Sequence, residues 1–503
     1  MATFLAIFIN FSKKQIKKTI SVNTKIKYLR RFFMRKFSTD FEANIKTLDK
    51  ELNVDENFDI IKREMIINSR RVVMYYVDGF VTASLMQKLM MHLVTIKEFG
   101  STGATTVEEF VKLSVPSVEV DPCYDLDSAE RLVLSGCSLI VSDAFYDGSI
   151  IVDARSYPAR ITAEPENDKV MRGSRDGFVE TMIFNTAMIR RRIRDTNLVV
   201  KYATAGEKSR TDISIVYIKG KANPKYVDEI EKRIKNIKTD ALVMGHQSLI
   251  ECLVKHKWYN PFPKVRCTER PDAACASILE GSVVVICDNS PEALILPTGI
   301  FDFLQETDDY YFPPIVGSYL RIVRQLVFWS SMVLIPLWYL IITNPQFMPQ
   351  GLEFLVPKDA GHVPILAQLL IVEVVIDGLK LASLNTPSVM SNSFGVIGGL
   401  LLGDFAVQIG WLSADVIFYM AIVSIASFTQ SNYELGYAFK FIRIITLILI
   451  ALFDIWGLIT GFAIGIFLVA TNSTINGKRS YLYPLIPFNK EALSRLLLRR
   501  KKP

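Results

Sequence analysis

Acidic side chains inside otherwise apolar stretches are the residues of this sequence whose placement most strongly suggests chemistry. Glu373 and Asp377 are four residues apart in PILAQLLIVEVVIDGLKLAS, so a helix would place both on one face, with Lys380 about one turn further on. Asp404 lies within GGLLLGDFAVQIG, and Asp454 lies within LIALFDIWGL. An ionisable group at membrane depth costs about 2.5 kcal/mol or more and normally faces a bundle interior or a wet cavity. The pattern therefore predicts an ion path lined by these acids, which would suit a cation.

The same acids also have a structural interpretation. The helix that carries Glu373 and Asp377 could lie at the membrane interface with its acids facing water. Buried acids could also be paired with the basic side chains of Lys380 or Arg443. The sequence leaves both interpretations open.

A second pattern is the segment VMRGSRDGFVETMIFNTAMIRRRIRD, residues 170–195. Its glycines do not form a phosphate loop, because the GxxxxGK[ST] spacing is missing and Asp176 would face the phosphate. The segment instead predicts a helix with Ser174 as its N-cap and basic residues at its end. Those basic residues are Arg190, Arg191, Arg192 and Arg194. We expect them to contact a neighbouring subunit, another lobe of the chain or lipid headgroups; a solvated helix end is the alternative, and nucleic acid is not expected.

Catalytic and cofactor-binding groups are sparse in this sequence. The four histidines are scattered and accompany no Ser or Cys motif, so a nucleophilic triad is not expected. His246 and His256 are ten residues apart, with no carboxylate at a spacing that would make them ligands. The six cysteines form no CxxC pair, and we expect buried, reduced thiols. The sequence thus predicts a protein that is not an enzyme and holds no metal or cofactor.

Apolar helices in the C-terminal part must position the acids. Gln325–Thr343 carries no charge over 19 residues, which is enough for one membrane crossing. Further apolar segments follow at 364–383, 394–410, 413–429 and 441–470. The last is either one long tilted helix or a hairpin broken around Trp456 and Gly457. Because basic residues precede the first crossing and fill the tail, both the soluble part and the C-terminus are expected in the cytoplasm, which requires four or six crossings.

The soluble part shows an internal repeat. RVVMYYVDGF and ISIVYIKGKA are β-rich runs ending near a glycine, and later SAERLVLSGCSLIVSDAFYDGSIIVDA and AACASILEGSVVVICDNSPEALILPTG share a helix, glycine, strand, turn and strand. The pattern predicts two α/β lobes with mixed sheets, followed by an all-α polytopic transmembrane domain. The expected divisions are a basic N-terminal segment, interfacial or disordered, a first lobe, a second lobe, a transmembrane domain and a basic cytoplasmic tail, at residues 1–56, 57–165, 166–315, 316–475 and 476–503.

Charge at the chain ends suggests one class of partner. Ten Lys or Arg residues lie between Lys13 and Lys36, and eight more lie between Lys478 and Lys502. Basic ends flanking an apolar region favour contact with anionic lipids.

Several stretches resemble the GerA family, the A subunits of bacterial spore germinant receptors. They are the 170–195 segment, KSRTDISIVYIKGKANP, NPFPKVRCTERPDAACASILEGSVVVICDNSPEALILP and NYELGYA. Three others, FDIIKREMIINSRRVVMYYVDGF, TDDYYFPPIVGSYLRIVR and IDGLKLASLNTP followed by LYPLIPFN, are most similar to the stage V sporulation AF branch of that family. The resemblance runs in order from about Phe58 to the C-terminus.

This resemblance implies a two-lobed cytosolic domain and a membrane domain in the inner membrane of the spore. It further implies a homo-oligomeric ion channel that opens in germination and amplifies the signal. Our own hypothesis is that the released ions are monovalent cations. Its partners would be a small membrane protein, germinant receptors or components of the dipicolinate channel. The alternatives are a non-conducting scaffold for other channel subunits, a nutrient-sensing receptor A subunit, or a dipicolinate transporter subunit with basic rather than acidic intramembrane groups.

Overall fold

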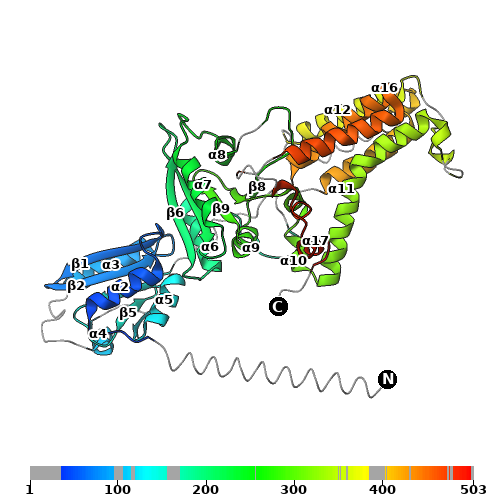
Figure 1. Ribbon diagram of the computed structural model, residues 1–503. Coiled ribbons are helices and arrows are strands. Elements are labelled where there is room, and N and C mark those ends of the chain that lie inside the picture. The colour runs from blue at the N-terminus through cyan, green and yellow to red at the C-terminus, as the bar shows by residue number, and fades with distance from the viewer. Residues whose placement is uncertain are drawn as a thin grey trace, which may run out of the picture.

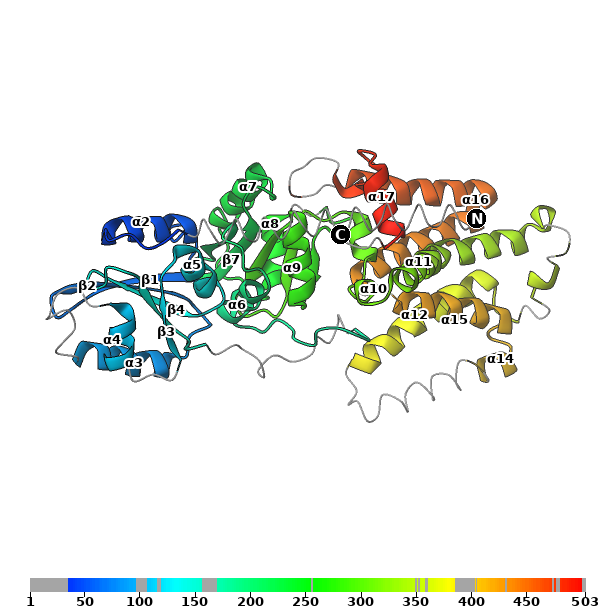
Figure 2. The same cartoon turned by 90° about the horizontal axis from the view of Figure 1, so that it is seen from below.

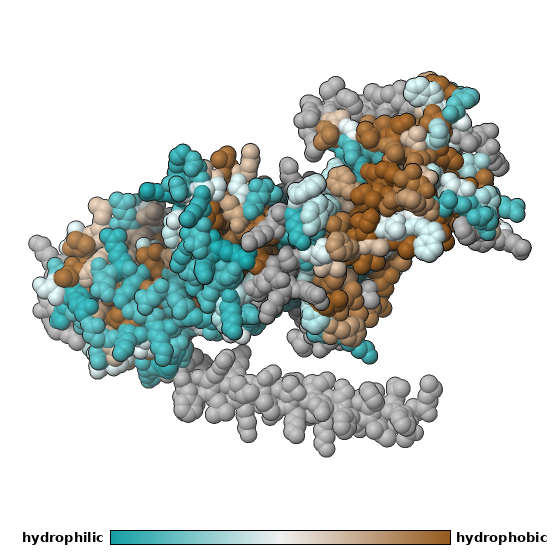
Figure 3. Space-filling model, turned by 45° about the horizontal axis from the view of Figure 1, so that its top comes forward, coloured by the Kyte–Doolittle hydropathy of each residue, from teal (hydrophilic) through white to brown (hydrophobic). Residues whose placement is uncertain are grey.

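The computed structural model describes residues 35–95, 106–114, 119–155, 170–254, 257–348, 351, 353–357, 361–384, 403, 405–429, 432–472, 475 and 480–499. These residues form an α/β part made of two lobes and a separate helical part (Figure 1). Hydrophobic residues gather on the visible surface of the helical part, whereas the lobes are mostly hydrophilic (Figure 3). The two parts therefore present different surfaces to their surroundings.

The first lobe is a five-stranded sheet with helices on both faces. Its strands are β1 (Ile60–Ile67), β2 (Arg70–Val77), β3 (Val120–Cys123), β4 (Ser138–Ser142) and β5 (Ser149–Val152), in the spatial order β1-β2-β4-β5-β3. Its helices are α2 (Phe41–Leu52), α3 (Ala83–Thr95), α4 (Val107–Ser114) and α5 (Leu126–Leu134). One apolar cluster joins α2 and α5 to one face, and a second joins α3 and α4 to the other (Figure 2).

The second lobe repeats this topology. Its strands are β6 (Leu198–Ala205), β7 (Thr211–Ile218), β8 (Arg266–Thr268), β9 (Val283–Cys287) and β10 (Ala293–Leu296), in the order β6-β7-β9-β10-β8. Its helices are α6 (Met182–Arg192), α7 (Pro224–Lys235), α8 (His246–Leu253) and α9 (Pro271–Glu280). The expected mixed sheets are wrong: every strand pair within the two described sheets is antiparallel. Helices α5 and α9 connect strands that run in the same direction, but β5 and β10 lie between those strands in the sheets, so the βα pattern produces no adjacent parallel pair there.

Strand β9 shows why a strand that is covered on both faces is apolar at every position. Alternate residues of a strand point to opposite faces. Val283 and Val285 join the cluster under α7 and α8, whereas Val284 and Ile286 join the cluster under α6 and α9. Both faces of the sheet are thus covered, and all five residues of β9 are buried.

Helix α6 begins later than the sequence predicts. It starts at Met182 after Thr181, and Ser174 lies well upstream in a non-helical segment. The backbone N–H of Met182 donates instead to Asp288 Oδ1 of the β9–β10 turn, at 2.9 Å. A carboxylate distant in sequence therefore satisfies the helix start, which local capping rules do not detect.

Among the described residues, two helices of the helical part are long and apolar enough to cross a membrane, α11 (Pro314–Thr343) and α16 (Tyr433–Thr471). The other described α-helices of this part are α10 (Asp308–Tyr311), α12 (Ile365–Leu384), α14 (Ala406–Gln408), α15 (Ala414–Phe428) and α17 (Lys490–Leu497). Short 3-10 turns lie at η1 (Ile300–Leu304), η2 (Pro345–Phe347), η3 (Glu353–Leu355) and η5 (Ser480–Leu482). The apolar segment expected at 394–410 lies largely outside the described residues.

Helix α16 folds back on itself. Asp454 has non-helical backbone angles, φ 49° and ψ −125°, which interrupt the helix. A Cβ at Gly457 would overlap the carbonyl oxygen of Leu449, and one at Gly461 would overlap Thr446 Oγ1. Contacts in this antiparallel order need glycine, because only glycine allows the two backbones to approach so closely. Of the two forms expected for this stretch, the structure has the hairpin, with limbs of about 30 and 25 Å.

Both ends of the described chain pack onto the body of the protein. The expected N-terminal segment extends to residue 56, but α2 lies within it and packs on the first sheet, so residues 36–56 belong to the first lobe. Residues 1–34 lie outside the described residues. At the other end, Arg499 Nη2 donates to the carbonyl of Tyr310 at 2.7 Å. The tail therefore returns to the start of α11.

Candidate functional site

The two acids of α12 form a polar cluster with basic residues of α16. Glu373 Oε1 accepts hydrogen bonds from Arg443 Nε at 2.8 Å and Arg443 Nη2 at 2.5 Å. Lys440 Nζ lies 3.2 Å from Glu373 Oε2 and also pairs with Asp377. Arg443 Nη1 donates to the carbonyl of Ser331 in α11, at 2.9 Å. Three helices therefore meet at one charged centre.

Helical spacing explains this arrangement. Glu373 and Asp377 are one turn apart on α12, as expected, and Lys440 and Arg443 are one turn apart on α16. The first limb of α16 runs antiparallel to α12. Lys440 therefore meets Asp377, and Arg443 meets Glu373. The sequence offered Arg443 only as one optional partner and did not indicate Lys440.

The cluster is buried and adjoins a small cavity. The side chains of Glu373 and Arg443 are 5% and 6% exposed. The cavity has a volume of about 40 Å³, which is room for two or three water molecules. On its far side, Lys380 Nζ donates to Ser427 Oγ of α15 at 3.0 Å. Three basic and two acidic side chains line this space, so its formal charge is +1.

This geometry corrects the expectation of a path lined by acids. Glu373 and Asp377 are held in ion pairs, which is the alternative that the sequence left open. Burying charge is costly unless the charges are paired and hydrogen-bonded, and here each acid has a basic partner. In this state the charged side chains of the cluster bind one another and do not line an open path for cations.

The remaining two acids do not join the cluster. Asp454 stands at the tip of the α16 hairpin, is exposed, and accepts a hydrogen bond from Asn344 Nδ2 at 2.9 Å. In this structure it ties the hairpin turn to the end of α11, and its expected role in a pore or cavity stays a prediction. Asp404 lies outside the described residues.

Arg190 joins the two lobes. Its guanidinium is fully buried and donates from Nε and Nη2 to the two carboxylate oxygens of Asp59, at 2.9 and 2.8 Å. It also donates from Nη2 to Asn57 Oδ1 and from Nη1 to the carbonyl of Leu198. Of the contacts expected for the arginines, Arg190 makes the one with another lobe. Because it is buried between the lobes, it cannot reach a lipid or another subunit.

The other three arginines are more accessible. Arg192 is partly exposed, and its Nη2 donates to Asp176 at 2.7 Å and to Ser174 Oγ at 2.9 Å. Ser174 and Asp176 thus bind the helix end rather than capping its start. Arg191 and Arg194 are exposed at the surface of the second lobe. Their contact with a subunit or a membrane stays a prediction.

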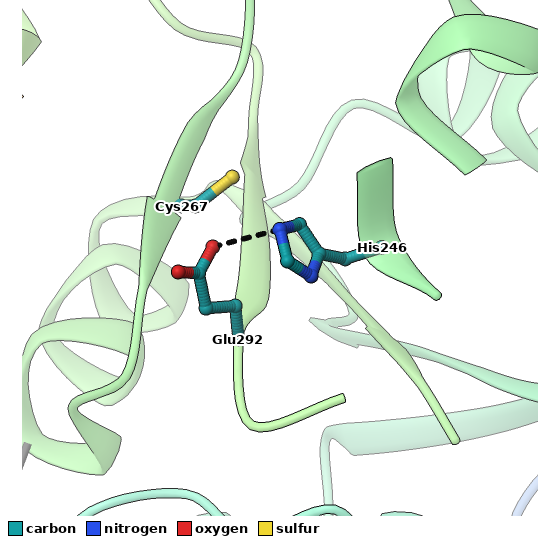
Figure 4. Close-up of side chains that lie close together, drawn as sticks. All are labelled: His246, Cys267 and Glu292. Atoms are coloured by element: carbon teal, nitrogen blue, oxygen red, sulfur yellow. Dashed lines mark ion pairs between the residues drawn. The ribbon is translucent and has the colours of Figure 1, made fainter. Parts of the chain in front are cut away.

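One further group of chemically active side chains was not expected. His246, Cys267 and Glu292 lie together in the second lobe, with one potential metal-ligating atom from each within 4.8 Å of the others (Figure 4). A hydrogen bond from His246 is the main reason that the pKa of Glu292 is lowered, although burial opposes it. The three residues come from separate elements, so no sequence spacing could have indicated them. The expectation that His246 is no ligand rested on His256, which lies outside the described residues.

Most of the cysteines match the expected buried thiols. Cys123, Cys137, Cys275 and Cys287 are buried, Cys267 is half-buried and Cys252 is exposed. Burial raises the pKa of Cys275 and of Cys287 to about 12, so both thiols stay protonated near neutral pH.

Among the described residues, two α/β lobes of identical strand order are joined to a bundle with two helices of membrane-crossing length, which indicates a membrane-associated protein. The family described as Bacillus/Clostridium GerA spore germination protein matches residues 46–503. The chain belongs to this family, as its motifs predicted.

The chain is similar to two curated proteins and to one solved structure. The chain is 37% identical to stage V sporulation protein AF of Bacillus subtilis (strain 168) over 461 residues, which cover 92% of each chain. It is 29% identical to spore germination protein KA of the same organism, over 92% of this chain and 85% of that protein. A crystal structure of the N-terminal domain of the A subunit of the Bacillus megaterium spore germinant receptor GerK3 aligns with a TM-score of 0.40 and 24% identity, covering 52% of this chain and 96% of that chain.

Proposed function

We propose that this chain is a subunit of an oligomeric ion channel in the inner membrane of the spore. It crosses that membrane several times, releases small ions during germination and thereby amplifies the germination signal. Other germination membrane proteins are its partners, and it performs no catalysis. The relatives support the setting, because they are named as sporulation and spore germination proteins.

The position of the polar cluster carries the proposal. Glu373 lies near the middle of α12, and Arg443 lies near the middle of the first limb of α16. Ser331, whose carbonyl binds Arg443, lies near the middle of α11. In a bilayer about 30 Å thick, helices of this length would hold the cluster close to the midplane. Ionisable groups persist at such a depth mainly where they serve transport or gating.

The pairing supports a gate more than a selectivity lining. The lining has a formal charge of +1, so it gives no electrostatic preference for cations. The proposed release of monovalent cations therefore does not depend on a path lined by acids. The Glu373–Arg443 pair joins α12 to α16, and Arg443 also holds α11. Opening would separate these helices and expose the charges to the water that enters.

The packing of the tail supports the proposed orientation. Arg499 contacts Tyr310 and Ser318, so the C-terminal tail lies at the same end of the helices as the lobes. Both ends would then lie in the cytoplasm, with an even number of crossings between them. Exposed apolar side chains on α11 and α16, such as Leu326 and Phe467, offer surface for lipid and for neighbouring subunits.

Recordings from the purified protein in planar bilayers would test the proposal. Wild-type protein should conduct with a low open probability. Glu373→Gln removes the charge that holds Arg443, and a loss of about 1.4 kcal/mol from the closed state would raise the ratio of open to closed channels about tenfold. Asp454→Asn is the matched control, because it neutralises an acid at the hairpin tip outside the cluster.

Spores carrying the same variants provide the second measurement. Glu373→Gln should change the rate of ion release during germination, whereas Asp454→Asn should not. Silence of wild-type protein in bilayers, together with unchanged ion release in Glu373→Gln spores, would reject the channel and favour a scaffold that organises other channel subunits.

A further inference from the structure

Three side chains with different donor atoms meet in the second lobe at the junction with the helical part. His246 Nε2 lies 3.0 Å from Glu292 Oε2. The sulfur of Cys267 lies within 4.8 Å of a ligand atom of each of these two residues. All three residues are half-buried, so the group is shielded by the protein but remains open to a small solute. Figure 4 shows the three side chains pointing toward one another.

Sheet register places two of these residues together. Cys267 of β8 lies opposite Leu294 of β10. Glu292 precedes Leu294 by two residues, and residues two apart point to the same face of a strand. The thiol and the carboxylate therefore project from one face at the edge of the sheet.

The third residue is positioned by a helix start and by a neighbouring hydroxyl. His246 is the first residue of α8 and follows Gly245, whose φ of +49° makes the turn into the helix. Its Nδ1 is 2.7 Å from the hydroxyl of Ser290, which is itself buried. This contact fixes the ring and directs Nε2 toward Glu292 and Cys267. Metal-ligating histidines almost always have their second ring nitrogen bound in this way.

We propose that His246, Cys267 and Glu292 form a binding site for one divalent metal ion of the zinc class. Nitrogen, thiolate sulfur and carboxylate oxygen are the three kinds of ligand that Zn²⁺ takes, and hard ions such as Ca²⁺ and Mg²⁺ do not take sulfur. Tetrahedral Zn²⁺ needs its ligand atoms about 3.5 Å apart. In the present group all three atoms lie within 4.8 Å of one another, so no pair needs to approach by more than about 1.3 Å. The fourth position is left for water.

The location gives the site a consequence for the whole molecule. Glu434, in the first turn of α16, is close enough to Glu292 and His246 for their charges to interact. A bound dication would attract this carboxylate and thereby strengthen the connection between the second lobe and the helix that carries Arg443. Metal binding at this site would in this way affect the helical part.

Metal titration of the full-length protein in mild detergent tests the site. Co²⁺ serves as a probe, because a thiolate ligand gives it a charge-transfer absorption band. The wild-type protein should bind one equivalent with this band, and Zn²⁺ should displace it. Cys267→Ser should lose the band, Glu292→Gln should bind at least tenfold more weakly, and Ser290→Ala should weaken binding by a smaller factor.

Matched controls separate a site from general thiol binding and from misfolding. Cys252→Ser removes the exposed cysteine elsewhere in the lobe and should leave both band and stoichiometry unchanged. Melting temperatures measured with EDTA should be equal for wild type and variants, and added Zn²⁺ should raise only that of proteins with an intact site. An unchanged band in Cys267→Ser, or no stoichiometric binding by wild type, would mean that the three residues form a hydrogen-bonded ion pair only. Because this test does not measure conduction, its outcome is independent of the channel proposal.

Discussion

Among the buried arginine–carboxylate pairs of the described residues, Arg190–Asp59 and Arg443–Glu373 connect parts of the molecule in different ways. In the α/β part, Arg190 is fully enclosed between the lobes and binds both carboxylate oxygens of Asp59. In the helical part, Arg443 binds one oxygen of Glu373 while Lys440 binds the other side of the same carboxylate. The first pair is balanced and isolated, whereas the second belongs to a larger set of charges beside a cavity.

The two pairs differ in whether they can rearrange. A closed pair with every hydrogen bond in place gains nothing from rearranging, so it fixes the two lobes in one relation. A network with a surplus charge and room for water has alternative partners of similar energy. Such a network can exchange contacts at modest cost, as a switching element must. The comparison predicts that equivalent substitutions should have unequal consequences.

The largest effect is expected at the lobe pair. Arg190→Met removes the only basic partner shown for a carboxylate that is itself buried, so the charge of Asp59 is left uncompensated. Loss of one member of a buried pair costs about 3–5 kcal/mol of unfolding free energy. Urea unfolding of the lobes in the full-length protein, followed by circular dichroism, measures this cost.

Two variants test the physical reason. Arg191→Met lies next in sequence but is exposed, so its effect should be small. Arg190→Met combined with Asp59→Leu removes both charges and should recover much of the lost stability, because the desolvation cost disappears with the pair. A double variant as unstable as Arg190→Met alone would show that packing rather than charge holds the lobes.

A smaller effect is expected at the helical pair. In Arg443→Met, Glu373 keeps Lys440 as a partner, and water in the cavity can solvate it. The loss of stability should therefore fall in the range of an imperfectly satisfied buried group, about 1–3 kcal/mol. Unfolding of the purified protein by SDS, with Lys440→Met and the Arg443→Met/Lys440→Met double variant alongside, measures it.

The double variant decides the comparison. If Lys440 compensates for the missing arginine, the double variant should lose more stability than the two single losses added together. Simple addition of the two losses would mean that the charges act separately, and the contrast with the lobe pair would fail.

The same contrast shows how far sequence could predict this protein. The repeat of two α/β lobes follows from local glycine and apolar patterns, and the structure has it. At 441–470 those patterns left a long tilted helix and a hairpin open, and the structure has the hairpin. The strand directions did not follow, because a βα pattern does not state whether the next strand runs parallel or antiparallel. The pairing of Glu373 with Arg443 could not be decided from local patterns either, because the two residues are 70 positions apart.

The arginine cluster shows the limit most clearly. Four arginines in five positions look equivalent in sequence, and charge argues for exposure at each of them. Arg190 nevertheless lies on the same buried face as Ala187, because Asp59 from the other lobe compensates its charge. The metal-ligating group was invisible for a related reason, since β8, α8 and the β10 turn each supply one residue.

The smallest effect is expected at Arg192, which separates charge pairing from burial. It binds Asp176 and Ser174 as closely as Arg190 binds Asp59, but about a quarter of each charged side chain is exposed. Water can therefore replace the lost partner, and such pairs contribute about 0–1 kcal/mol. Arg192→Ala and Asp176→Ala, alone and combined, should show a coupling energy below about 1 kcal/mol in urea unfolding. A coupling as large as that between Arg190 and Asp59 would mean that hydrogen-bond geometry, rather than exclusion of water, sets the strength of the lobe pair, and burial would no longer explain why the two arginines differ.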